Sequence, residues 1–155
     1  MACLHVVLVA PEIHWNTGNV GRTCLAVDAA LHLVQPLGFS LTDKHLQRAG
    51  LDYWPRVRVT VWSDWLTLEA ELPRMGKPTF FSTRAQHRYD QVQYPDPTVL
   101  VFGCESVGLP DDILSRHADS LVAIPMVDPA LRSLNLSTSV AIGAYEVRRQ
   151  WAQRT

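Results

Sequence analysis

Three short segments of this chain concentrate small and polar residues at points where an apolar run ends or begins. The first is Asn16–Arg22, the second is Phe102–Pro110, and the third runs from Ile124 to Ser137. Backbone amides at a helix start bind anions, and glycines let a ligand approach the main chain closely. Because open α/β sheets form their ligand sites beyond the carboxyl ends of the strands, we expect one composite site.

The first segment follows an apolar run and opens a predicted helix. At about 100° per residue, Arg22 falls nearly opposite the apolar stripe that begins at Val20, so its side chain can face another surface. Asn16 and Thr17 are candidate N-caps. Two roles stay open: a capped helix with a solvated arginine, or an anion-binding helix start with a functional one.

The second segment is a strand-to-helix turn. Gly103 ends a predicted buried strand, and Pro110 suits the first turn of a helix. Glu105 lies between them, where its carboxylate accepts hydrogen bonds either from loop amides or from a ligand. Both a tight turn and a ligand-binding loop fit this pattern.

The third segment leads from a predicted strand to the start of the last helix. Ser133, Asn135 and Ser137 lie at that start. One such residue is enough to cap a helix, so the density of polar side chains favours a binding site.

The elements that must position these segments alternate between strand and helix. Continuous apolar runs rich in β-branched residues are typical of strands covered on both faces, as in parallel sheets. The predicted strands are Leu4–Ala10, Leu31–Val34, Arg56–Val61, Thr79–Ser82, Thr98–Phe102 and Ser120–Ile124. The predicted helices are Asn19–Leu31, Asp64–Leu72, Pro110–Ser115 and Leu136–Trp151. This order predicts one α/β domain over residues 1–155, with a mostly parallel sheet flanked by helices.

Length and composition narrow the class of protein. A chain of 155 residues with 47% hydrophobic content fits one globular domain. Its three cysteines lack CxxC spacing and its six histidines lack ligand pairing, so we expect neither disulfides nor a metal site. The first apolar run is too short for a signal peptide or a membrane span, so we expect a cytoplasmic protein without membrane association.

Affinity for nucleic acid would need local basic clusters, because the net charge of −1 gives no bulk attraction. The candidate clusters are Lys44, His45 and Arg48; Arg84, His87 and Arg88; and Arg148, Arg149 and Arg154. Such clusters are more often solvated faces than RNA contacts. The aromatic segment Leu51–Pro55 either packs a loop, which is the commoner role, or stacks on a base.

Taken together and in this order, the three segments resemble the SPOUT class of RNA methyltransferases and its SpoU branch of ribose 2′-O-methyltransferases. The patterns are NxGNxxR, FGxExxGLP, and IPM followed by an SxNLS-type segment, and they span most of the chain. A narrower resemblance is to the TrmL subfamily, whose minimal members methylate the wobble ribose of certain leucine tRNAs. It rests on Pro11–Ile13, Asn16–Asn19, Pro36–Phe39 and Arg48–Trp54.

The resemblance implies a SPOUT fold with a C-terminal deep trefoil knot, an exception to unknotted topology. It further implies S-adenosylmethionine as cofactor, tRNA as substrate, and a homodimer that pairs through the first and last helices. By motif position Arg22 is the catalytic residue. The implied cofactor contacts are Phe81, Gly103, Glu105, Leu109, Ile124, Ser133 and Leu134. The implied RNA contacts are Asn16, Asn19, Arg22, Asn135 and Ser137.

The chain departs from the family pattern at four places. Val107 replaces the usual basic residue before the GLP segment, and Thr138 stands where close relatives have asparagine. His14-Trp15 replaces small or proline residues, and the loop Val127–Leu131 is one residue longer. These differences bear on RNA contacts more than on the cofactor site.

The leading functional hypothesis is S-adenosylmethionine-dependent 2′-O-methylation of a tRNA ribose, at the wobble nucleotide of leucine tRNAs. Two alternatives stay open: a SpoU-type methyltransferase for another tRNA or rRNA site, and an RNA-binding protein of the same fold with weak catalysis. The presence of Arg22 and of all three segments favours an enzyme.

Overall fold

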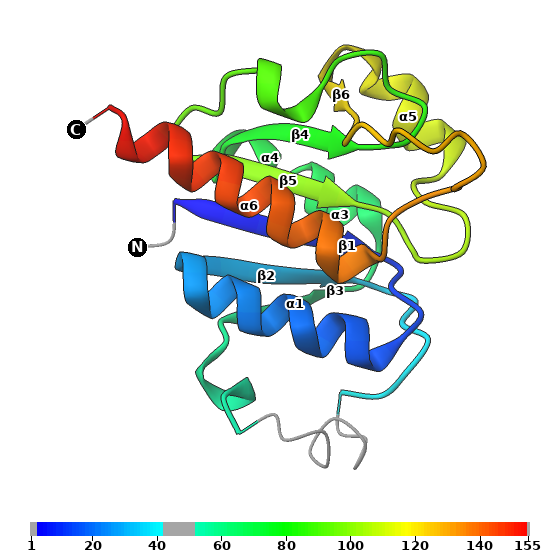
Figure 1. The fold of residues 1–155 in the computed structure, drawn as a ribbon. Coiled ribbons are helices and arrows are strands. Elements are labelled where there is room, and N and C mark those ends of the chain that lie inside the picture. The colour runs from blue at the N-terminus through cyan, green and yellow to red at the C-terminus, as the bar shows by residue number, and fades with distance from the viewer. Residues whose placement is uncertain (1–2, 42–51, 155) are drawn as a thin grey trace.

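The computed structural model describes residues 3–41 and 52–154, which form a six-stranded sheet between two layers of helices (Figure 1). The strands are β1 (Leu4–Val9), β2 (Ala29–Val34), β3 (Val59–Trp62), β4 (Lys77–Phe81), β5 (Thr98–Phe102) and β6 (Leu121–Val122). Their order is β3-β2-β1-β5-β4-β6, and every neighbouring pair is parallel. The predicted fold class, a parallel sheet flanked by helices, is confirmed.

Two long helices cover one face of the sheet and three short ones cover the other (Figure 1). The long helices are α1 (His14–Val27) and α6 (Leu136–Ala152); the short ones are α3 (Trp65–Glu69), α4 (Leu72–Met75) and α5 (Asp111–Arg116). Alternate residues of β1 enter the two cores, Leu4, Val6 and Leu8 on the α1–α6 side and Val7 and Val9 on the other. This two-sided burial explains why the strand reads as a continuous apolar run.

Helix α1 starts and ends earlier than the sequence predicts. Its N-cap is Ile13, so the prediction that Asn16 and Thr17 cap it is wrong; both lie inside the helix and are buried. The helix ends because Asp28 takes a left-handed conformation with φ of 56°. The predicted orientation of Arg22, away from the apolar stripe, is confirmed, and the residue is exposed.

Most other predicted elements also differ in their bounds, and for two of them the structure shows the cause. The strand predicted over Arg56–Val61 begins only at Val59, because the 3-10 turn η1 (Trp54–Arg56) precedes it and Pro55 fixes φ there. The helix predicted over Asp64–Leu72 is split into α3 and α4. Asp64 caps α3, and its carboxylate accepts a hydrogen bond from the amide of Thr67 at 2.8 Å.

The register of the sheet brings four strand ends to one edge. Leu8 of β1 pairs with Phe102, Phe80 of β4 pairs with Val101, and Phe81 pairs with Val122 of β6. The segments that follow β1, β4, β5 and β6 therefore emerge side by side at the carboxyl edge, where ligand sites of open α/β sheets form.

Within residues 3–41 and 52–154, no helix combines the length and the hydropathy that a membrane crossing needs.

A polar network joins β1, β2 and β3. The indole of Trp62 donates to Nδ1 of His32 at 3.0 Å, and Nε2 of His32 lies 3.0 Å from Nδ1 of His5. Since an indole N–H only donates, Nδ1 of His32 accepts and its Nε2 carries the proton. Burial, with a smaller effect from His5, lowers the pKa of His32 to about 4.

We expect the free energy of unfolding to fall as pH drops from 6.5 to 4. The unfolded chain protonates His32 near its ordinary pKa of about 6.5, whereas the folded chain resists protonation until about pH 4, so acid favours unfolding. The loss is roughly 2–3 kcal/mol, measurable by urea unfolding at several pH values. His32→Gln should show a shallower pH slope, and His87→Gln, at an exposed histidine, should keep the wild-type slope. Equal slopes for His32→Gln and wild type would contradict this account.

Candidate active site

A large cavity of about 810 Å³ lies at the carboxyl edge of the sheet. Its walls come from the segments after β4 and β5 and from the segment between β6 and α6. All seven residues predicted to contact the cofactor line it: Phe81, Gly103, Glu105, Leu109, Ile124, Ser133 and Leu134. The composite site expected from the sequence is thus a single cavity.

A chain of hydrogen bonds fastens the three segments to one another. The carboxylate of Glu105 accepts from the amides of Glu12 and Ile13 at 2.8 Å each, and from Nδ2 of Asn16 at 3.2 Å. Asn16, only 3% exposed, accepts in turn from Nδ2 of Asn135 at 3.1 Å. The node Glu105–Asn16–Asn135 therefore contains one residue from each predicted segment.

A second carboxylate, that of Glu12, joins the same two segments: the chain before α1 and the loop after β5. Glu12, just after β1, accepts from the amide and the hydroxyl of Ser106 at 2.9 and 2.7 Å. These bonds from Ser106 hold the pKa of Glu12 below its ordinary value. The sequence reasoning missed this pair, whose only signal was an acidic residue directly after a strand.

Asn135 joins the start of α6 to this junction. Its Oδ1 accepts from the amides of Ser137 and Thr138 at 2.9 and 3.3 Å, and from the Ser137 hydroxyl at 2.6 Å. The same side chain thus caps the helix and binds Asn16. Ser137, predicted to contact RNA, serves this cap and does not line the cavity.

Gly103 is needed to close the loop after β5. A Cβ at this position would lie 2.1 Å from the carbonyl carbon of Gly108 and 2.2 Å from the amide nitrogen of Leu109. The absent side chain therefore makes room for the loop's own backbone, which favours the tight-turn interpretation left open by the sequence. A bulky residue here would disturb the loop itself and not only a bound ligand.

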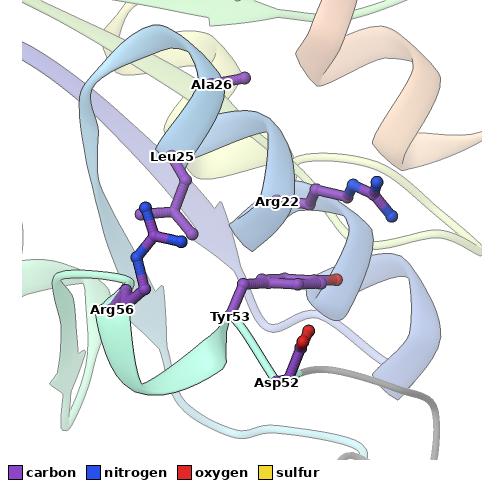
Figure 2. A pocket seen from close by; sticks show the side chains of 6 residues that line it. All are labelled: Arg22, Leu25, Ala26, Asp52, Tyr53 and Arg56. Atoms are coloured by element: carbon purple, nitrogen blue, oxygen red, sulfur yellow. The ribbon is translucent and has the colours of Figure 1, made fainter.

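Arg22 lies away from the large cavity. It lines a second pocket of about 360 Å³, formed by α1 and the segment Asp52–Arg56 (Figure 2). Its guanidinium carbon is 5.8 Å from the centre of the Tyr53 ring. Of the other predicted RNA contacts, Asn16 and Asn135 line the large cavity, whereas Asn19 lines neither pocket.

Three arginines of the described basic clusters form ion pairs at the surface. The pairs are Arg84 with Asp111, Arg88 with Asp90 and Arg149 with Glu146. Lys44, His45, Arg48 and Leu51 lie outside the described residues. In the aromatic segment, Trp54 packs against Gly21, where a Cβ would lie 2.5 Å from its ring. In the part of the chain that the structure describes, no three acidic, histidine or cysteine residues are grouped to hold a metal ion.

Comparison with known proteins identifies the family. The model of the SpoU rRNA Methylase family matches residues 3–145. The chain belongs to this family. It is 44% identical over 148 residues to the tRNA (cytidine(34)-2′-O)-methyltransferase of Burkholderia ambifaria, with 94% of each chain covered. The predicted membership of the SpoU branch, and with it an RNA methyltransferase, is confirmed.

Solved structures agree with this assignment. One, described as giving structural insights into the 2-OH methylation of C/U34 on tRNA, has a TM-score of 0.90 and 42% identity, with 97% of each chain covered. Another, an AdoMet-bound rRNA methyltransferase from Sinorhizobium meliloti, has a TM-score of 0.83 and 25% identity. The alignment covers 95% of this chain and 56% of that one.

We expect Glu105→Gln to loosen the junction between the segments. Glutamine keeps one acceptor oxygen but turns an NH2 group toward a backbone N–H donor, so the free energy of unfolding should fall by about 1–3 kcal/mol. Hydrogen exchange should also quicken at residues 12–16 and 103–108. The control is Glu71→Gln, which breaks a surface ion pair with Arg74 far from the cavity. Unchanged exchange in both segments of the Glu105 variant would show that the carboxylate does not hold them.

Proposed function

We propose that this protein methylates the 2′-hydroxyl of the wobble nucleotide, position 34, of tRNA, with S-adenosylmethionine as the methyl donor. The observation that carries the proposal is the convergence of all three SpoU segments in one cavity, joined through Glu105, Asn16 and Asn135. The names of the Burkholderia relative and of the aligned tRNA-methylation structure support the same substrate.

The large cavity fits the proposed cofactor in size and chemistry. Its volume of about 810 Å³ falls within the range of small-molecule sites. Phe81, Leu109 and Ile124 offer apolar walls for a purine, and the loops around Gly103 and Ser133 offer backbone donors and acceptors. Bound there, S-adenosylmethionine would supply an electrophilic methyl group. The protein's part is to hold this donor and bring the ribose hydroxyl into line with it.

Arg22 is proposed to position the acceptor. A guanidinium stays protonated at any working pH, so it is poorly suited to abstract the hydroxyl proton itself. Its fork of donors suits the ribose and a neighbouring phosphate, and proton removal would then depend on that phosphate. Its exposed position on α1 leaves the guanidinium open to RNA.

A homodimer is part of the proposal. The resemblance implies pairing through α1 and α6, and each of these helices carries an exposed aromatic side chain, Trp15 at 57% and Tyr145 at 55%. Exposed aromatic residues are typical of interface cores. Pairing there would also bring Arg22 of one subunit toward a second copy.

Three finer parts of the proposal come from the resemblance: the trefoil knot, leucine tRNAs as substrates, and a cytoplasmic location. For the knot, the path of the chain gives support. Strand β6 lies at the sheet edge beyond β4, yet α6 lies over β5 and packs against α1. Residues 123–135 therefore return across the strand ends (Figure 1).

Mapping of 2′-O-methylation across total tRNA, with and without the gene, tests the proposal. We expect loss of the methyl group at position 34 of leucine tRNAs. Loss of a methyl group at another tRNA or rRNA position would show that the enzyme acts on that position instead of on position 34. RNA binding without methyl transfer by the purified protein would favour the alternative of a catalytically weak RNA-binding protein.

We expect Arg22→Ala and Arg22→Lys both to lower kcat by about 100-fold or more, because a point charge does not reproduce a bidentate fork. Affinity for S-adenosylmethionine, measured by calorimetry, should stay unchanged, since Arg22 does not line the large cavity. Arg58→Lys, at a surface ion pair with Asp28, is the control. Substantial activity of Arg22→Lys would argue against bidentate positioning.

We expect Val107→Arg to tighten tRNA binding. Val107 is 79% exposed and lines the large cavity, where the family usually has a basic residue. One added phosphate contact should steepen the salt dependence of binding by about one unit of slope, with cofactor affinity unchanged. Leu66→Arg adds the same charge on α3, at a side chain 64% exposed on the other face. If both variants behave alike, position 107 does not face the RNA.

A further inference from the structure

The guanidinium groups of three arginines make neither an ion pair nor a hydrogen bond with another described residue. These arginines are Arg22, Arg56 and Arg132. Six other arginines pair with carboxylates, and Arg148 and Arg154 donate to backbone carbonyls. Arg132 lines the large cavity, whereas Arg22 and Arg56 line the small pocket together. A guanidinium without a carboxylate or carbonyl partner at a concave surface is available to an anion.

The small pocket is a subsite of its own. It shares no lining residue with the large cavity. Figure 2 shows the Tyr53 ring as its floor, with Arg22 near the hydroxyl end and Arg56 beside the opposite end. Asp52 lies next to the hydroxyl end and its carboxylate points toward the ring (Figure 2). Two arginines and one aspartate give the lining one net positive charge.

Packing against α1 fixes the position of the Tyr53 ring. The Tyr53 hydroxyl donates to the carbonyl of Gly18 at 3.0 Å, and the amide of Arg56 donates to the carbonyl of Tyr53 at 2.9 Å. Trp54 packs on Gly21, whose missing side chain admits the indole ring. The ring that faces the pocket is thus fixed before any ligand arrives, which lowers the entropy cost of binding.

The lining has the chemistry of a nucleotide site. The Tyr53 ring is half-buried, and the accessible part of an aromatic ring can stack on a base. A guanidinium without a carboxylate partner, such as that of Arg56, binds a phosphodiester. The Asp52 carboxylate repels phosphate but accepts a hydrogen bond from a base amino group or a ribose hydroxyl. The phosphate therefore belongs at the Arg56 end of the pocket and the base over Tyr53.

We propose that this pocket binds one nucleotide of the RNA substrate next to the methylated one, with its base on Tyr53 and its phosphate on Arg56. The inference rests on the proposed function, under which Arg22, at the other end of the same ring, orients the acceptor ribose. Arg56 and Tyr53 then act as RNA-binding residues that select single-stranded RNA, such as an anticodon loop, over a paired stem.

Direct binding of tRNA to the purified protein, followed by fluorescence anisotropy at several salt concentrations, tests the proposal. Arg56→Gln should weaken binding about tenfold and reduce the salt slope by about one. Arg58→Gln removes the same charge two residues away, from an arginine paired with Asp28 at 2.8 Å. This variant should leave both the affinity for tRNA and its salt slope unchanged. Tyr53→Phe keeps the aromatic face and should bind nearly as wild type, whereas Tyr53→Leu should lose about tenfold.

Steady-state methylation gives the second readout. Arg56→Gln should raise KM for tRNA by a similar factor with kcat and cofactor affinity unchanged, because its contact is equal in ground and transition states. Wild-type affinity and salt slope in Arg56→Gln would overturn the proposal, whether or not the enzyme methylates tRNA. Failure of wild-type methylation, with the binding effects intact, would overturn only the proposed function.

A free nucleotide is the competing occupant, and calorimetry with cytidine 5′-monophosphate separates it from RNA. In one outcome the wild-type protein binds the monophosphate, and Arg56→Gln loses that binding while it keeps the wild-type affinity for tRNA. That result would assign the pocket to a free nucleotide and overturn the proposal. Absence of binding by the monophosphate, together with weaker tRNA binding by the variant, supports a nucleotide held within an RNA strand.

Discussion

The carboxylate of Glu105 is the interaction on which the rest of the site depends. Parallel strands bring their carboxyl ends to one edge, but they leave the loops beyond that edge without a regular hydrogen-bond ladder. Glu105 binds the chain entering α1, 92 residues away in sequence at Ile13, and Asn16 passes the connection to Asn135 at the start of α6. Both long helices therefore begin at the same node, and the cavity between the loops is formed before a ligand binds.

Helix α1 connects the two concave sites. Its first turn carries Asn16, which lines the large cavity, and its third turn carries Arg22, which lines the pocket with Tyr53. Under the proposed function, a donor cavity and an RNA-binding surface that share one helix keep a fixed relation to each other, as in-line transfer between two bound reactants requires. The two hydrogen bonds that Ser106 donates to the Glu12 carboxylate hold the chain just before the same helix.

The sequence predicted the sheet well and the junction poorly, for a physical reason. Strand β5, Thr98–Phe102, was predicted to the residue because its side chains are buried on both faces and the run is continuously apolar. The start of α1 was missed because its partner is a carboxylate from a distant loop, which no local pattern records. Asn16 looked like a cap, yet it lies buried in the helix as the link between segments. Local periodicity reports burial, whereas long-range polar pairing appears only in the folded chain.

The central claim is that residues from three distant segments form one cofactor cavity. The most direct measurement is the change in backbone amide NMR resonances when S-adenosylmethionine is added to the purified protein. The account predicts that Phe81, Gly103 and Ser133, one from each wall of the cavity, shift together with a single dissociation constant, while Tyr53 and Arg56 in the small pocket stay unchanged. Shifts confined to one segment, or centred on the small pocket, would contradict it.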